Sequence, residues 1–269
     1  PPSQLEPADL AIPSTQTNHP GALTSFQSWS TLLLRYVEKR NLANQFDYKQ
    51  PWFDDVGSTN YDVARTKNFL FECPSTPGSE RADPYHVINA AAGDYAPITE
   101  VMPQVFTQVL GYADPPPESQ RKGFMSRFRP NRTRDCRDGL SQTLFIAESA
   151  GRPEVWLNGS KMTLDDFASY AGDQVVQYNY EPVPVSGTGW ADPDAAFDIH
   201  GASSDGLNEY GPYFINAINV GEVYSFHQTG ANFALADGSS RYILSDIDEK
   251  MFISLCTRAG GETIDQSDF

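Results

Sequence analysis

Apolar residues recur at helical spacing in one stretch near the start of the chain, residues 28–44. The apolar positions are Trp29, Leu32, Leu33, Tyr36 and Val37, and charged residues fall between them. A period of about 3.6 residues predicts an amphipathic helix with one buried face. Ser28 or Ser30 can cap this helix, because a serine hydroxyl accepts a hydrogen bond from a free backbone N–H of the first turn.

The middle of the chain consists of short apolar runs separated by turn residues, which predicts short strands joined by long loops. A second helix is expected over residues 60–68, followed by a buried strand at 69–73 that ends at Pro74. Further strands are expected at residues 85–91, 143–148, 155–157 and 167–170.

The strongest local signal lies near the C-terminal end, where Asp237-Gly238 separates two apolar runs, residues 231–236 and 239–244. An Asp-Gly pair in this position predicts a β-hairpin with a type I′ turn, because glycine adopts positive φ at no steric cost. A closing helix is expected over residues 248–258. Its apolar face consists of Met251, Phe252 and Leu255.

Residues 1–23 are rich in proline, serine and threonine and have no apolar period, which predicts an extended arm or linker. Residues 24–269 have the length of one domain. Together the elements predict an α+β fold, with an N-terminal helix packed on an antiparallel β-sheet, long loops and a C-terminal helix. No stretch is long and apolar enough to cross a bilayer, so no membrane span is expected in this form.

The charge of the chain narrows the range of partners. The sequence has 19 Lys and Arg against 35 Asp and Glu, which gives a formal net charge of −16. Such a field repels phosphate backbones, so nucleic acid is not expected as a partner. Hydrophobic residues make up 39% of the 269 residues, enough to build a folded core.

Known catalytic signatures do not occur in the sequence. It has no G-x-S-x-G, no H-E-x-x-H and no phosphate-binding glycine loop, so their absence favours a non-enzymatic protein but leaves an unfamiliar active site open, and no cofactor is required. Cys73, Cys136 and Cys256 form no C-x-x-C pair, which argues against a cysteine-ligated zinc site. These cysteines leave two interpretations open: one disulfide with one free thiol, or three buried thiols.

Short motifs between residues 28 and 263 occur in the order typical of one family. The longest runs from His227 to Asp237-Gly238, with nine residues between the histidine and the aspartate. The others are Phe71-Glu-Cys-Pro-Ser75, Gly93-Asp-Tyr-Ala96, Asp138-Gly-Leu-Ser-Gln-Thr143 with Glu148, Gly189-Trp-Ala-Asp-Pro193 and Thr257-Arg-Ala-Gly-Gly-Glu262. On these motifs the chain resembles the domain-of-unknown-function family 1559, whose C-terminal signature is the prepilin-type processing-associated H-x9-D-G motif.

The resemblance implies a relative of type IV pilins and of secretion pseudopilins, of the kind abundant in planctomycetes. Such proteins carry a β-rich head behind a long hydrophobic helix, and that helix is absent from this sequence. The expected protein is therefore a pilin-like head that is extracellular or at the cell surface. Its expected function is filament or surface assembly, or adhesion, through self-association into an oligomer or filament.

The H-x9-D-G motif can be interpreted as catalytic or as structural. His227 and Asp237 would be a catalytic pair only if they met, but a strand of that length spans about 30 Å at about 3.3 Å per residue. We therefore expect the imidazole to bond loop backbone and the motif glycines to serve backbone geometry. The motif positions are His227, Gly230, Asn232, Asp237 and Gly238, with Trp190 from the separate Gly-Trp-Ala-Asp-Pro motif.

Four aspartates lie within fourteen residues in a glycine-containing stretch: Asp192, Asp194, Asp198 and Asp205. Ca²⁺ binds roughly six to eight oxygen atoms, which a flexible acidic loop can supply. The sequence therefore suggests a Ca²⁺ site here, although the spacing is not that of an EF-hand. A solvated acidic loop is the alternative.

A second function rests on aromatic residues in the middle third of the chain. If they are exposed, they can stack on sugar rings, whereas burial in a core is the competing interpretation. Glu148 and Asp192 would then supply acid–base chemistry. This alternative is a secreted carbohydrate-binding or carbohydrate-cleaving protein with polysaccharide as its partner. Its stacking residues would be Trp156, Tyr178 and Trp190, with Tyr170 and Tyr180 nearby in sequence.

Overall fold

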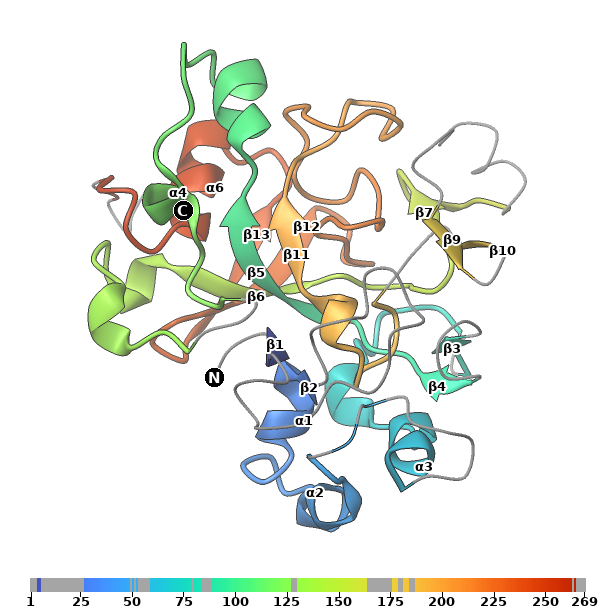
Figure 1. Cartoon of the computed structure of the whole chain (residues 1–269). Helices are drawn as coiled ribbons and strands as arrows, with labels where there is room; N and C mark the ends of the chain where they lie inside the picture. Colours follow the sequence, from blue (N-terminus) through green and yellow to red (C-terminus); the bar gives the residue numbers. More distant parts are fainter. Residues whose placement is uncertain are drawn as a thin grey trace.

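The fold is mixed α+β, with one central sheet and short helices around it (Figure 1). This confirms the α+β class that the sequence predicts. The computed structural model describes residues 4–5, 27–48, 50, 52, 59–78, 80–83, 89–126, 130–163, 176–178, 181–183, 187–262 and 264.

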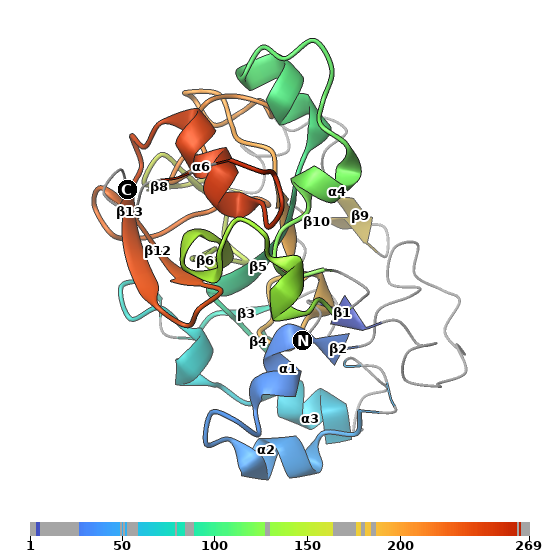
Figure 2. The ribbon, with the colours of Figure 1, turned by 90° about the vertical axis from the view of Figure 1, so that its left-hand side faces the viewer.

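The central sheet has five strands within the described residues. In spatial order they are β11 (Phe197–Ile199), β5 (Tyr95–Val101), β6 (Leu144–Glu148), β12 (Gly230–Leu235) and β13 (Ser240–Leu244). Neighbouring strands are antiparallel except β11, which is parallel to β5. The sheet is mixed rather than purely antiparallel, because β11 joins β5 after a long crossover and not through a hairpin. Figure 2 shows β12 and β13 side by side at the opposite edge.

Short elements make up the rest of the described structure. The helices are α1 (Trp29–Leu33), α2 (Arg40–Gln45), α3 (Thr59–Arg65), α4 (Glu118–Arg121) and α6 (Glu249–Cys256), with one-turn helices η1 (Phe69–Phe71), η2 (Val105–Val109), η3 (Thr133–Asp135), η4 (Leu140–Gln142) and η6 (Pro193–Ala195). Four strand pairs stand apart from the sheet: β1 (Gln4–Leu5) with β2 (Gln27–Ser28), β3 (Ala82–Asp83) with β4 (Ala90–Ala91), β7 (Trp156–Leu157) with β8 (Ser160–Lys161), and β9 (Val176–Tyr178) with β10 (Glu181–Val183).

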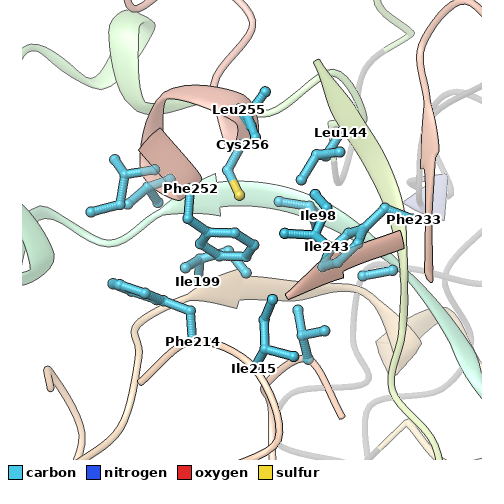
Figure 3. Close-up of a cluster of buried hydrophobic side chains, with 14 of the residues drawn as sticks. Ile98, Leu144, Ile199, Phe214, Ile215, Phe233, Ile243, Phe252, Leu255 and Cys256 are labelled. Atoms are coloured by element: carbon cyan, nitrogen blue, oxygen red, sulfur yellow. The ribbon is translucent and has the colours of Figure 1, made fainter. Parts of the chain in front are cut away.

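Helix α6 packs on the sheet through the largest apolar cluster (Figure 3). Phe252 is fully buried, and its ring lies 5.2 Å from that of Phe214 and 5.9 Å from that of Phe233, measured between centroids. Burying a side chain of this size contributes about 1.5–3 kcal/mol. The helix begins where expected because the Asp248 carboxylate accepts a hydrogen bond from the backbone N–H of Met251 at 2.9 Å. The predicted closing helix is confirmed.

A second apolar cluster joins the N-terminal helices to the sheet. Its centre is aromatic: the ring of Phe71 stacks on that of Trp190 at 5.5 Å and meets the edge of Trp29 at 5.7 Å. Tyr95 of β5 and Phe145 of β6 pack against this cluster. The sheet is therefore anchored by two separate cores, one formed with α6 and one with the N-terminal segments.

The prediction of a single helix over residues 28–44 is wrong. The chain forms α1 and α2 instead, and between them Glu38 has a φ of +60°. A residue in the left-handed region ends an α-helix. The apolar stripe fails at the same place, because Tyr36 is exposed. The Ser28 cap is confirmed, since its side chain accepts a hydrogen bond from the backbone N–H of Ser30.

Other local predictions have mixed outcomes. The helix at 60–68 corresponds to α3, and the strand at 143–148 to β6, whereas the run at 69–73 forms η1 and not a strand. Asn68 favours this tight turn because its side chain accepts a hydrogen bond from the backbone N–H of Leu70. Of the remaining predicted strands, 155–157 contains β7, only Ala90–Ala91 of 85–91 is a described strand, and 167–170 lies outside the described residues.

The predicted hairpin is β12 and β13, but its turn is not type I′. A type I′ turn needs positive φ at both central residues, and only Gly238 has it, with φ +90°. The N–H of Gly238 donates to the carbonyl of Leu235, and the N–H of Leu235 donates to Ser239. This pattern is that of a three-residue loop whose last residue is a left-handed glycine.

Three further features bear on the sequence expectations. Of the predicted arm at 1–23, only Gln4–Leu5 is described, and it pairs with β2 of the same chain. Cys73, Cys136 and Cys256 are all buried and free, which corresponds to the second of the two cysteine interpretations. Among the described residues, no helix has the length and apolarity to cross a membrane.

Candidate functional site

Three chemically reactive side chains from distant parts of the chain meet at one point. They are Cys73, Glu148 and His227, whose ligand atoms all lie within 4.8 Å of one another. No other group of three or more cysteine, histidine or carboxylate side chains gathers in this way within the described residues. The thiol and the carboxylate are buried, whereas the His227 side chain is 30% exposed. This cluster is the candidate site.

Cys73 is placed by the turn that follows η1. Its carbonyl accepts a hydrogen bond from the backbone N–H of Thr76 at 3.0 Å, which closes the Cys-Pro-Ser turn. Its own N–H donates to Oδ2 of Asp94 at 2.8 Å. Asp94 is fixed in turn by two contacts with the guanidinium of Arg81, at 2.8 and 2.6 Å. The thiol therefore sits on a segment fastened to the start of β5.

Glu148 is the last residue of β6 and is held by the neighbouring strand β12. Its Oε2 accepts the backbone N–H of Asn232 at 2.6 Å and the Asn232 side-chain amide at 3.3 Å. The other oxygen, Oε1, lies 3.2 Å from Nε2 of His227. Oε2 therefore holds the Glu148 side chain in place, while Oε1 faces the other members of the cluster.

His227 lies just before β12 and closes the cluster from the solvent side. Its backbone N–H donates to the hydroxyl of Ser225 at 3.0 Å, and its ring meets the edge of the Tyr242 ring at 6.2 Å. Nε2 lies 3.8 Å from Sγ of Cys73 as well as 3.2 Å from Glu148. The expectation that the imidazole bonds loop backbone is wrong, because its partners are two side chains from other segments.

The surroundings of the thiol keep it protonated. Burial raises the pKa of Cys73, the backbone of Ser75 opposes this rise by hydrogen bonding, and the carboxylates of Glu148 and Asp94 add to it. Burial also raises the pKa of Tyr95, and the neighbouring Cys73, Glu148 and Asp94 raise it further. A thiol in this environment is a poor nucleophile, because the thiolate is the reactive form.

The geometry also argues against a catalytic triad. In a triad the imidazole uses one ring nitrogen for the nucleophile and the other for the carboxylate. Here the same nitrogen, Nε2, faces both the sulfur of Cys73 and the carboxylate of Glu148. The three side chains converge on a shared point and do not form a relay. Convergence of sulfur, nitrogen and oxygen donors is the arrangement that holds a metal ion.

The cluster was not predicted as a unit, although its members come from the quoted motifs. Cys73 belongs to the Cys-Pro-Ser motif, Asp94 to Gly-Asp-Tyr-Ala, and Glu148 follows Asp-Gly-Leu-Ser-Gln-Thr. His227 and Asn232 both belong to the H-x9-D-G motif. The missing C-x-x-C pair led us to expect no cysteine-ligated zinc site, but this absence bears only on sites built from neighbouring cysteines. When each ligand comes from a different motif, the sequence contains no short ligand spacing by which the site could be recognised.

The aspartate and glycine of the H-x9-D-G motif lie at the other end of β12, away from the cluster. Asp237 accepts the N–H and the hydroxyl of Ser239, at 2.8 and 2.6 Å, and these bonds lower its pKa. Its own N–H donates to Leu140. Asp237 and Gly238 therefore shape the hairpin loop, and Gly230 packs so closely on β13 that a Cβ there would lie 2.0 Å from the Ile243 carbonyl oxygen.

The aspartates suggested as a Ca²⁺ site contact different neighbours in the structure. Asp192 is buried and caps η6 through the N–H of Asp194, Asp198 bonds the Thr99 hydroxyl, and Asp205 bonds Ser203 and Leu207. Burial raises the pKa of Asp192, as do the neighbouring Asp194 and Asp83. No group of three ligand side chains that includes these aspartates gathers among the described residues. Calcium binding stays a prediction.

The aromatic residues suggested for sugar stacking do not share a described surface. Trp190 is only 2% exposed and its indole N–H donates to Thr66, so it is a core residue and cannot stack on a sugar. Trp156 is partly buried against Phe226, with ring centroids 4.8 Å apart. Tyr178 lies in β9, but its side chain, like all of Tyr170 and Tyr180, is outside the described part. The acid–base pair is also unfavourable, because Glu148 and Asp192 are both 1% exposed.

Comparison with known proteins gives one match. The model of a family described as "Protein of unknown function (DUF1559)" matches residues 6–250, which is most of the chain. Neither the curated proteins nor the solved structures contain a match.

Proposed function

The chain belongs to the DUF1559 family, and on this premise we propose that it is a pilin- or pseudopilin-like head that acts outside the cell in surface or filament assembly, or in adhesion. The proposal has one structural support, an edge strand suited to contact with a second copy. It extends the resemblance of the motifs to pilin-type proteins.

The supporting observation is the outer edge of the central sheet. β13 is the last strand in the sheet order, and within the described structure it pairs only with β12. Tyr242 and Leu244 on this strand are 43% and 50% exposed, while Ile243 between them is buried. An exposed edge strand presents unpaired backbone N–H and C=O groups, which pair readily with a strand of another chain.

The charge of the protein sets a condition on such assembly. Copies with a formal net charge of −16 repel one another at low ionic strength. Salt screens exposed charges, with a Debye length of about 10 Å at 0.1 M. Association through β13 is therefore expected to strengthen as salt is added, or as Ca²⁺ binds the acidic surface.

The test is the mass of the particle in solution, measured by light scattering over a concentration series with and without Ca²⁺ and at two salt concentrations. Leu244→Lys places a charge on the edge strand, and Leu70→Lys is its matched control because Leu70 is similarly exposed, at 46%, on η1. We expect oligomers that Leu244→Lys abolishes and Leu70→Lys retains. A monomer under every condition, or equal loss in both variants, would reject the edge-strand assembly.

The carbohydrate alternative has no comparable support. Its stacking residue Trp190 lies in the core, and its carboxylates Glu148 and Asp192 are buried. A second function is therefore not proposed.

A further inference from the structure

We propose that Cys73, Glu148 and His227 form a binding site for a divalent transition metal of the Zn²⁺ class, with three protein ligands and one open position. This inference is independent of the proposed assembly function. It rests on the donor set, on the distances between the donors, on the groups that orient them and on access from solvent.

The donor set selects the kind of metal. A thiolate is a soft ligand, an imidazole is intermediate and a carboxylate is hard, and Zn²⁺ accepts all three. Ca²⁺ and Mg²⁺ prefer sites made of oxygen atoms, so a sulfur and a nitrogen among three ligands disfavour them. Three protein ligands with the fourth position open are typical of non-structural zinc sites.

The spacing of the donors already suits a tetrahedral ion. With bonds of about 2.3 Å to sulfur and about 2.0–2.1 Å to nitrogen and oxygen, tetrahedral angles place sulfur and nitrogen about 3.5 Å apart and nitrogen and oxygen about 3.3 Å apart. The corresponding distances here are 3.8 Å from Sγ of Cys73 to Nε2 of His227, and 3.2 Å from Nε2 to Oε1 of Glu148. These two distances lie within a few tenths of an ångström of the tetrahedral values, and the remaining pair, Sγ of Cys73 and the Glu148 carboxylate, lies within 4.8 Å.

The ligands are oriented by other groups, as in established metal sites. Asn232 binds the outer oxygen of Glu148 through its backbone N–H and its side-chain amide. Asp94 binds the backbone N–H of Cys73, and Arg81 holds Asp94. These contacts leave Sγ, Nε2 and Oε1 directed toward one another.

The cluster is also accessible to solvent, and the charge of its ligands suits a divalent cation. The His227 side chain is 30% exposed, so an ion can reach the cluster from solvent on that side. The buried carboxylate of Glu148 contacts the His227 imidazole at 3.2 Å, and the Cys73 thiol lies beside both groups. A divalent cation would replace the thiol proton and bind the thiolate and carboxylate together.

The first experiment uses Co²⁺ as a spectroscopic probe on the untagged protein after treatment with a chelator. Co²⁺ bound to a thiolate gives a charge-transfer band in the near ultraviolet, and Zn²⁺ added afterwards should abolish the band by displacement. We expect one Co²⁺ per chain with this band, and an excess of Ca²⁺ or Mg²⁺ should leave the band unchanged. Absence of the band in the unaltered protein would overturn the proposal.

Variants then test the ligands. Cys73→Ser should remove the band, whereas Cys136→Ser should keep it, because Cys136 is a buried thiol that contacts Thr143 and lies outside the cluster. Asn232→Ala removes only an orienting amide and should weaken Zn²⁺ binding roughly 10-fold. A band that persists in Cys73→Ser would overturn the proposal.

A loss of fold could imitate a loss of binding, so each variant also needs a circular dichroism spectrum and a melting curve. His227→Gln is the second ligand variant, because its partly exposed side chain can change with little effect on the core. Zn²⁺ should raise the melting temperature of the unaltered protein and of Cys136→Ser, since a ligand that binds the folded state stabilises it. An equal rise in folded His227→Gln would contradict the assignment of His227 as a ligand.

Discussion

The carboxylate of Asp94 accepts the backbone N–H of Cys73 at 2.8 Å and thereby ties the start of β5 to the turn that carries the thiol. The same carboxylate binds the guanidinium of Arg81, whose side chain is almost fully buried. Cys73 and Asp94 are 21 positions apart in sequence, and no local sequence pattern predicts the hydrogen bond between them.

Replacement of Asp94 by Asn should destabilise the protein strongly. The change leaves the Arg81 charge buried without its carboxylate, which typically costs about 3–5 kcal/mol in the free energy of unfolding. Glu154→Gln is the matched control, because its pair with Lys161 is largely exposed and such pairs contribute about 0–1 kcal/mol. Urea denaturation measures both. Equal effects of the two substitutions would show that the Asp94 pair has no special structural role.

Two glycines of the hairpin should respond very differently to replacement by alanine. Gly230→Ala places a Cβ 2.0 Å from the Ile243 carbonyl oxygen, so β12 and β13 must separate, at a cost of about 3 kcal/mol or more. Gly238→Ala meets no atom within 4 Å and costs only the left-handed φ, about 1 kcal/mol. Thermal melting of both variants should give this order, and the reverse order would contradict the close packing of β12 on β13.

The pair formed by His200 and Glu222 should make stability depend on pH. Burial lowers the pKa of His200, but the Glu222 carboxylate, 2.6 Å from Nδ1, outweighs it and raises the pKa to about 9. Because the folded-state pKa lies above the ordinary value of about 6.5, the stabilisation is complete below pH 6.5 and is lost as the pH rises through 9.

The His200–Glu222 pair contributes on the order of 3 kcal/mol to the free energy of unfolding at low pH, since each pKa unit corresponds to about 1.4 kcal/mol. Unfolding free energies measured between pH 6 and pH 10 should fall over this window in the unaltered protein. The fall should be much smaller in His200→Gln, which cannot take up the proton. The same slope in both proteins would assign the pH dependence to other groups.

Truncation of Phe252 should be among the most damaging changes in the core. The ring is fully buried between Phe214 and Phe233, so Phe252→Ala should cost about 3–5 kcal/mol through lost burial and the remaining cavity. Phe69 is 74% exposed, and Phe69→Ala should change stability by less than about 0.5 kcal/mol. Denaturation midpoints compare the two, and a mild effect at Phe252 would mean that α6 does not need this contact.

Local sequence patterns do not predict the candidate site. Each member could be read from the sequence as part of a motif, but Cys73 and His227 are 154 residues apart and have no common spacing. Besides their places in the motifs, the sequence suggests Glu148 for acid–base chemistry on sugars and Trp190 for stacking on a sugar ring. Burial decides against both roles, and burial depends on which segments pack together.

Features that depend on neighbouring residues could be predicted from the sequence. The α+β class, the helix capped by Asp248 and the hairpin at Asp237-Gly238 follow from periodicity, capping and turn chemistry over a few positions. Three features became visible only in the folded chain: the break at Glu38, the parallel pairing of β11 with β5 and the meeting of Cys73, Glu148 and His227. These features depend on contacts between segments far apart in the chain, whose free energies outweigh local preference and leave no periodic trace in the sequence.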